Sequence, residues 1–287
     1  MKPPAEPTFG HIGLPDTNLH YMKVGSGPPL VIVPATVSLI RQWESLAQFM
    51  GERYTTYFFE LPGHGESSPY SEAFKSNKVP KTVAAFMNAM GHETFNLMGF
   101  SFGGLLAMRT LETLQNRIEN VFLLAPCVSK QALLFSAIKQ WGLKRVCATL
   151  KSPKVQERLI QVMHCRRFDR MLCKIISKMG NINEQILKTR DALRIPRSTL
   201  DVLAYTIEEI FSVEYAYPAK PFEHKCFFGM SLYDDLLDYD TTLGVVQDHF
   251  KDLTVHSFTL PYHQPPKTPT FEWLMDEFGS FLALLPS

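Results

Sequence analysis

The sequence predicts an α/β fold in which helices cover a mostly parallel β-sheet. Strand-like and helix-like segments alternate through the first 125 residues, as in parallel β-α-β units. Helical patterns alone fill residues 128–215, and the alternation resumes after Pro218 and Pro221. The chain has 287 residues, of which 45% are hydrophobic and 20% charged, so one large α/β domain can account for both alternating parts.

The individual elements follow from hydrophobic periodicity and from turn residues. Extended segments at 11–14 and 19–24 predict a strand pair. The run Leu30-Val31-Ile32-Val33 is continuous and β-branched, which indicates a strand buried on both faces. Further strands are expected at 54–60, 95–98 and 121–124, and helices at 38–50, 79–90 and 103–114. Glycine and proline at 62–65 indicate a loop.

Residues 128–215 are expected to form a helical insertion. Apolar residues recur there at helical spacing from Leu134 to Ile176, with breaks at Pro153, Gly180-Asn181 and Pro196. A strand at 226–230, a helix at 242–250, a strand at 253–259 and a helix at 271–284 follow. We therefore expect a core domain formed by residues 1–127 and 216–287, and a separate insertion formed by residues 128–215.

Charge is distributed unevenly along the chain, although the net charge is only +1. Residues 128–200 contain sixteen basic and four acidic residues, so the insertion is cationic and the remainder is acidic. A cationic amphipathic surface of this kind could bind weakly to an anionic membrane. The simpler interpretation, which the sequence favours, is a solvated basic face. Nucleic-acid binding is not expected, because the basic region carries no recognisable binding motif.

The five cysteines form no C-x-x-C pair, and their number is odd. This pattern excludes a disulfide framework and a zinc site and fits a reducing cytoplasm. The N-terminal residues lack the apolar run of a signal peptide, and no stretch of eighteen apolar residues occurs. We therefore expect a cytoplasmic protein.

The sharpest chemical signal is Gly99-Phe100-Ser101-Phe102-Gly103, which lies between a predicted buried strand and a predicted helix. This is the G-x-S-x-G nucleophile elbow, in which glycines two residues on either side of the serine relieve steric conflict in a tight turn. The turn would expose the Ser101 hydroxyl at the head of a helix, where free N–H groups favour negative charge. The N–H group of Phe102 would be one oxyanion donor.

With this motif the chain resembles the α/β-hydrolase superfamily over almost its whole length. The segment Glu60-Leu61-Pro62-Gly63-His64-Gly65-Glu66-Ser67 also resembles the D-x-P-G-x-G-x-S loop of that family. The resemblance implies an eight-stranded, mostly parallel sheet with a helical cap between strands six and seven. It also implies a catalytic triad in the chain order serine, acid, histidine.

For the acid and the base, the resemblance implies Asp234 and His263. Asp234 takes the acid position after the family's seventh strand, with Asp235 as a close competitor and Asp238 as a distant one. Ser231 stands where the family usually has glycine. Of nine histidines, only His263 lies in the loop after the last strand, where Tyr262 replaces the usual glycine. His64, in the glycine loop, is interpreted as structural.

The second oxyanion donor is expected from the loop after Val33. The family often has H-G-x there and uses the N–H of the third residue, whereas this chain has Pro34-Ala35-Thr36. By position Thr36 would donate, but the missing H-G pair is a departure. Loss of one such donor slows an enzyme by about 10² to 10³, so a misplaced Thr36 would give a slow enzyme.

These residues predict a serine hydrolase that cleaves small-molecule carboxylic esters. The insertion is rich in Leu, Ile, Met and Phe, which suits an apolar acyl group. Arg166, Arg167 and Arg170 could hold a substrate carboxylate or phosphate. Nothing in the sequence calls for a metal or an organic cofactor, and nothing indicates the oligomeric state.

Three alternatives remain open at this point. An acyltransferase or a C–C bond hydrolase would use the same triad. A binding protein without catalytic activity is also open, because of the departures at Thr36 and Tyr262 and because a fold alone does not prove function. A dehalogenase or an epoxide hydrolase is disfavoured, because those family members have aspartate in place of Ser101.

Overall fold

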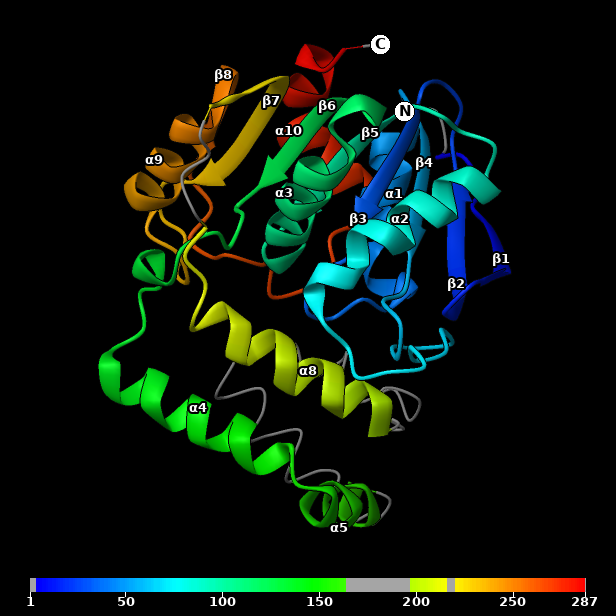
Figure 1. Ribbon diagram of the computed structural model, residues 1–287. Coiled ribbons are helices and arrows are strands. Elements are labelled where there is room, and N and C mark those ends of the chain that lie inside the picture. The colour runs from blue at the N-terminus through cyan, green and yellow to red at the C-terminus, as the bar shows by residue number, and fades with distance from the viewer. Residues whose placement is uncertain (1–3, 164–196, 216–219, 287) are drawn as a thin grey trace.

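The computed structural model describes residues 4–163, 197–215 and 220–286. Its centre is an eight-stranded sheet in the order β1-β2-β4-β3-β5-β6-β7-β8 (Figure 1). The strands are β1 (Thr8–Leu14), β2 (Thr17–Val24), β3 (Pro29–Val33), β4 (Thr55–Phe59), β5 (Phe95–Phe100), β6 (Ile118–Leu124), β7 (Phe222–Ser231) and β8 (Phe250–Phe258).

Only the two contacts made by β2, with β1 and with β4, are antiparallel. All pairings from β4 through β3, β5, β6 and β7 to β8 are parallel. The carboxyl ends of these six strands therefore meet at one edge of the sheet, where ligands bind in open α/β folds. The predicted mostly parallel, eight-stranded α/β-hydrolase sheet is confirmed.

Helices cover both faces of the sheet (Figure 1). One face packs against α2 (Val79–Ala89), α3 (Phe102–Leu114) and α9 (Tyr239–His249), and the other against α1 (Ile40–Gly51) and α10 (Phe271–Leu284). The short 3₁₀ helices are η1 (Ser76–Lys78), η2 (Gln115–Arg117) and η3 (Lys130–Ala132).

The strand β3 shows why its sequence has no polar alternation. Val31 and Val33 belong to the apolar core under α2 and α3, whereas Leu30 and Ile32 belong to the core under α1 and α10. Successive side chains point to opposite faces of a strand. Both faces are covered, so every position is apolar, as predicted.

The chain between β6 and β7 contains the helices α4 (Ala137–Leu150), α5 (Pro153–Met163) and α8 (Arg197–Ile210). They lie beyond the carboxyl edge of the sheet, and α8 is the helix next to the core (Figure 1). The hydroxyl groups of Ser198 and Thr199 donate to the carbonyl oxygen of Gly63, at 3.1 and 2.6 Å. Arg109 of α3 also pairs with Glu209 of α8.

A helical cap thus stands between strands six and seven, where the resemblance placed it. The limits at residues 128 and 215 stay a prediction. The predicted helical pattern at 164–176 and the breaks at Gly180-Asn181 and Pro196 lie outside the described residues. Within residues 4–163, 197–215 and 220–286, no helix combines the length and the apolar character needed to cross a bilayer.

Candidate active site

Ser101 lies at the sharp turn between β5 and α3, with a backbone φ of 54° and ψ of −123°. A left-handed φ is uncommon for a residue other than glycine and stores strain. The turn is held by two backbone bonds: the N–H of Ser101 donates to Leu124 O at 3.0 Å, and its carbonyl accepts from the N–H of Cys127 at 2.9 Å.

The glycines beside Ser101 are required by close backbone approach. A Cβ atom added to Gly99 would lie 2.2 Å from the carbonyl oxygen of Gly103. One added to Gly103 would lie 2.4 Å from the carbonyl oxygen of Val33, and one added to Gly104 would lie 2.4 Å from the Cβ of Pro126. The helix α3 can therefore begin directly at the sheet only with glycine at these positions.

His263, in the loop after β8, contacts the serine. Its Nε2 lies 2.8 Å from Ser101 Oγ, and its Nδ1 lies 2.7 Å from Asp234 Oδ2. An ionised carboxylate can only accept, so Nδ1 carries the proton and donates to Asp234. Nε2 is then free to accept the hydroxyl proton of Ser101. The ring of Phe100 stacks on the imidazole, with centroids 5.1 Å apart.

Asp234 lies in the turn after β7 and is buried, with 1% of its side chain exposed. Its Oδ1 accepts from the N–H groups of Leu236 and Leu237, both at 2.8 Å. These two donors fix the carboxylate and leave Oδ2 for His263. A buried carboxylate with three donors is well compensated for the loss of water.

The neighbouring acidic residues make other contacts. Asp235 Oδ1 accepts from the backbone N–H of His263 at 2.7 Å and so anchors the loop rather than the ring. Asp238 caps α9 by accepting from the N–H of Thr241 at 2.9 Å. Among the three candidate acids, only Asp234 contacts the imidazole.

The predicted oxyanion donors lie on adjoining segments. Phe102 begins α3, and the close approach of Gly103 to Val33 and Pro34 brings the loop after β3 against the first turn of this helix. Thr36 follows in that loop and is half-buried. The donor roles of Thr36 and Phe102 stay predictions.

The loop that carries Thr36 is held in place by its neighbours. The indole N–H of Trp43 donates to Val37 O at 2.9 Å. Ser38 Oγ accepts from the N–H of Leu61 at 3.0 Å and lies 2.6 Å from His64 Nδ1. Ser38 is fully buried, so its pairing with His64 Nδ1 lies inside the core.

His64 is therefore part of the support of this loop. Burial lowers the pKa of His64 to about 4, so the ring is neutral near neutral pH. Within the part of the chain that the structure describes, the buried His64 Nε2 has no hydrogen-bond partner.

Two supporting residues were not recognised as such in the sequence. Ser231 Oγ donates to Leu260 O at 2.5 Å and accepts from the N–H of Tyr233 at 3.1 Å, so it ties the end of β7 to the loop of His263. The departure from glycine at position 231 was the available signal. The stacking of Phe100 on His263 had no signal, because the G-x-S-x-G pattern does not specify that position.

Cys127, whose backbone N–H donates to the carbonyl oxygen of Ser101, is not a competing nucleophile. Cys127 is buried, and burial raises the pKa of its thiol to about 12, so the thiolate is scarce near neutral pH. Cys165 and Cys173 lie outside the described residues, as do Arg166, Arg167 and Arg170.

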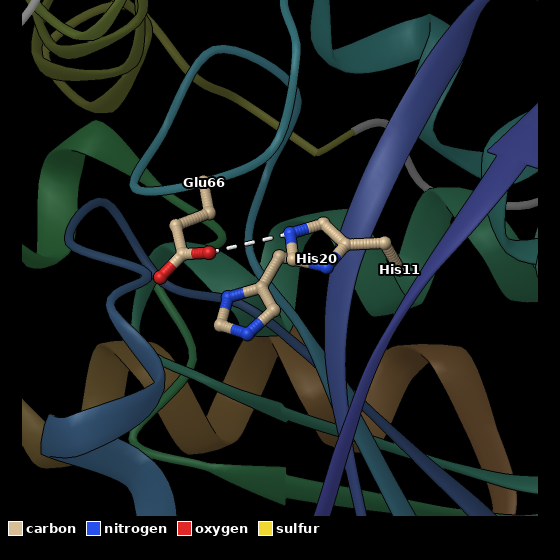
Figure 2. A group of neighbouring side chains, drawn as sticks. All are labelled: His11, His20 and Glu66. Atoms are coloured by element: carbon tan, nitrogen blue, oxygen red, sulfur yellow. Dashed lines mark ion pairs between the residues drawn. The ribbon is translucent and has the colours of Figure 1, made fainter.

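In the described part of the chain, one group of side chains could hold a metal ion. His11 of β1, His20 of β2 and Glu66 of the glycine loop each place a donor atom within 4.8 Å of the others (Figure 2). Each of the two histidines is already paired with a carboxylate. His11 Nε2 lies 3.3 Å from Glu66 Oε2, and His20 Nδ1 lies 3.1 Å from Glu60 Oε2. Paired histidines and carboxylates account for this arrangement, and we assign no metal to it.

The fold and the local geometry agree with a comparison to known families. A model of the alpha/beta hydrolase fold matches residues 28–191. The chain belongs to the α/β-hydrolase fold family. The match includes the glycine loop, Ser101 and the start of the cap.

The relatives that this chain matches in sequence have names that indicate different reactions. N-formylmaleamate deformylase of Pseudomonas putida is 26% identical over 122 residues, which is 42% of this chain and 46% of the relative. Soluble epoxide hydrolase of Corynebacterium sp. is 24% identical over 37% of each chain. The chain thus aligns with less than half the length of these relatives.

Solved structures extend the likeness in fold to nearly the full length. An esterase from Thermogutta terrifontis superposes with a TM-score of 0.66 at 14% identity and covers 96% of this chain and 98% of the esterase chain. At this identity the likeness concerns the fold.

Proposed function

We propose that the chain is a serine hydrolase that cleaves carboxylic esters with an apolar acyl group. The carrying observation is the unbroken hydrogen-bonded series from Ser101 Oγ through His263 to Asp234. The strained turn at Ser101 and the two backbone donors to Asp234 support it.

The proposed reaction begins when Ser101 Oγ attacks the ester carbonyl carbon while His263 Nε2 takes the hydroxyl proton. The negative oxygen of the tetrahedral intermediate is stabilised by the N–H groups of Phe102 and Thr36. His263 then gives its proton to the leaving alcohol, which forms the acyl-enzyme. Asp234 keeps the imidazole in the required tautomer and stabilises its charged form.

Hydrolysis of the acyl-enzyme repeats these steps with water. His263 takes a proton from the water as its oxygen attacks the acyl carbon, and returns the proton to Ser101 as the acid leaves. No metal or organic cofactor is needed for either half of this sequence. We further propose that the substrate is a small molecule held under the cap and that the protein acts in the cytoplasm, where its cysteines stay reduced.

Hydrolysis of p-nitrophenyl esters of increasing acyl length tests the proposal. The native protein should release p-nitrophenol, with rates that rise with acyl length to the limit of the cap, and Ser101→Ala should abolish the activity. Ser257→Ala is a matched control, because Ser257 lies on β8 and bonds to Tyr239 instead. If both folded proteins fail on every ester, the reaction belongs to an acyltransferase, to a C–C bond hydrolase or to no enzyme.

A further inference from the structure

The cap exposes an unusual concentration of large apolar side chains. Ten such side chains are exposed in the described part of the chain, and four of them fall within thirteen residues of the cap. They are Leu134, Ile138, Trp141 and Val146, with exposed fractions of 52%, 83%, 62% and 51%. Single exposed apolar residues are common, but a cluster of this kind marks an interaction surface.

Two of these residues form an apolar stripe on one side of α4. Ile138 and Trp141 are spaced at i and i+3, which places them on the same side of the helix, whereas Leu134 precedes the start of α4 at Ala137. Cys147, on the opposite side, is 2% exposed. In Figure 1, α4 lies on the side of α8 that faces away from the sheet. The stripe therefore points out of the molecule.

The charged residues beside this stripe are all basic. Residues 137–151 contain Lys139, Lys144, Arg145 and Lys151 and no acidic residue. Lys151 pairs with Glu208. Across residues 4–163, 197–215 and 220–286, the other three make no ion pair with a carboxylate. The guanidinium of Arg145 lies 5.1 Å from the centre of the Trp141 ring, which leaves a cation and an aromatic ring together at the surface.

We propose that α4 docks the protein on an anionic lipid bilayer, with Ile138 and Trp141 in the headgroup region and Lys139, Lys144 and Arg145 against lipid phosphates. Tryptophan and aliphatic side chains beside lysine and arginine are the composition of helices that lie in a membrane interface. The inference goes beyond the proposed ester hydrolysis, because docking needs no turnover.

The charges favour a bilayer over a second copy of the chain. A symmetric dimer would place the same patch on both sides of its interface. Lys139, Lys144 and Arg145 of one copy would then face basic residues of the other, and α4 offers no carboxylate to compensate them. An anionic bilayer satisfies both the cations and the apolar stripe.

Vesicle sedimentation of the Ser101→Ala protein tests the proposal without turnover. The protein should bind vesicles of phosphatidylcholine with phosphatidylglycerol at low salt, and should bind vesicles of phosphatidylcholine alone far more weakly. The tryptophan emission should shift to the blue on binding, and Trp141→Phe should remove this shift, because Trp141 is exposed whereas Trp43 is buried and Trp273, outside the cap, is half-buried.

Two double variants separate the contributions of the basic and the apolar side chains to vesicle binding. Lys144→Gln with Arg145→Gln should weaken binding about 25-fold, since each basic residue near an anionic surface contributes about fivefold. Ile138→Ser with Trp141→Ser should abolish the remaining binding. Two matched controls have their changes at exposed positions outside the cap. The double variant Lys75→Gln with Lys81→Gln matches the charge change, and Leu284→Ser matches the apolar change. Both should bind vesicles as the native protein does.

Three results would overturn the proposal. The first is the absence of binding to anionic vesicles at low salt by a protein with native circular dichroism. The second is binding that the α4 variants leave unchanged. The third is a native dimer that Ile138→Ser with Trp141→Ser converts to a monomer, without lipid binding by either protein, which would make the stripe an interface between copies.

Discussion

At the scale of single residues, the site depends on which atom of each acidic side chain faces His263. Asp234 and Asp235 are adjacent in sequence, yet Asp234 Oδ2 meets the ring nitrogen and Asp235 Oδ1 meets the backbone N–H. The first contact decides which imidazole nitrogen carries the proton. The second holds the loop and leaves the tautomer unchanged. The two carboxylates should therefore differ greatly in their effect on rate.

We predict that Asp234→Asn lowers kcat for ester hydrolysis roughly ten-thousand-fold, because an amide N–H facing Nδ1 favours the wrong tautomer. Asp235→Asn should lower kcat only about tenfold, the effect expected for a weakened anchoring hydrogen bond. Steady-state kinetics on one p-nitrophenyl ester measures both. Equal losses in the two variants would show that Asp234 has no special role.

At the scale of elements, the elbow depends on how closely α3 can approach β3. Gly103 packs against the carbonyl oxygens of Val33 and Pro34, and this contact joins the turn of Ser101 to the loop of the predicted oxyanion donor. The same loop is held from its other side by Ser38 and His64. Both contacts should affect stability as well as rate.

We predict that Gly103→Ala lowers the free energy of unfolding by about 1–3 kcal/mol, because the new methyl group would overlap the carbonyl oxygen of Val33. The activity should also fall. Gly244→Ala in α9 is the matched control, since a Cβ atom there meets nothing within 4 Å. It should raise stability by about 0.5–1 kcal/mol, the helix propensity of alanine over glycine. Urea denaturation compares the three proteins, and an unchanged Gly103→Ala would contradict the packing.

His64 should give the stability a component that depends on pH. Burial lowers the pKa of His64 from 6.5 to about 4. Between these two pKa values His64 is protonated in the unfolded chain but not in the folded protein. Stability therefore falls as the pH decreases from 6.5 to 4, and this loss is complete below pH 4. The loss should approach about 3 kcal/mol.

His64→Asn removes this titration. The stability of the variant should therefore fall less steeply between pH 6.5 and 4 than that of the native protein. Its stability near neutral pH should be lower, because the bond to Ser38 is altered. Urea denaturation across this range measures both curves. Parallel curves would show that His64 does not titrate as a buried ring.

At the scale of the whole molecule, the sequence predicted the sheet, the cap position and the sharp turn at Ser101. Periodicity located all eight strands. The largely apolar runs of β3 and β5 reflect burial on both faces of the sheet, and the one polar residue among them, Asn96, is buried too. Periodicity placed the start of β7 at residue 226, four residues late. The first residues of β7, Phe222–Lys225, alternate between buried and more exposed positions, and polar side chains such as Glu223 hid the strand.

The sequence could not resolve the details of the site in the same way. Asp234 and Asp235 are the same residue type in the same turn, so only the direction of each carboxylate separates them. His64 supports the Thr36 loop through its contact with Ser38, and these two residues are 26 positions apart in the sequence. No local sequence pattern predicts such a contact. The outward direction of the α4 stripe also depends on how the cap packs against α8.

The proposed reaction requires that Ser101 is a nucleophile activated by His263. Labelling with a fluorophosphonate probe, followed by peptide mass spectrometry, tests this requirement. We predict one adduct on the peptide that contains Ser101, no adduct in Ser101→Ala, and labelling at least about a thousandfold slower in His263→Ala, because the hydroxyl then keeps its proton. No adduct on a folded native protein, or an adduct on another serine that Ser101→Ala leaves in place, would contradict it.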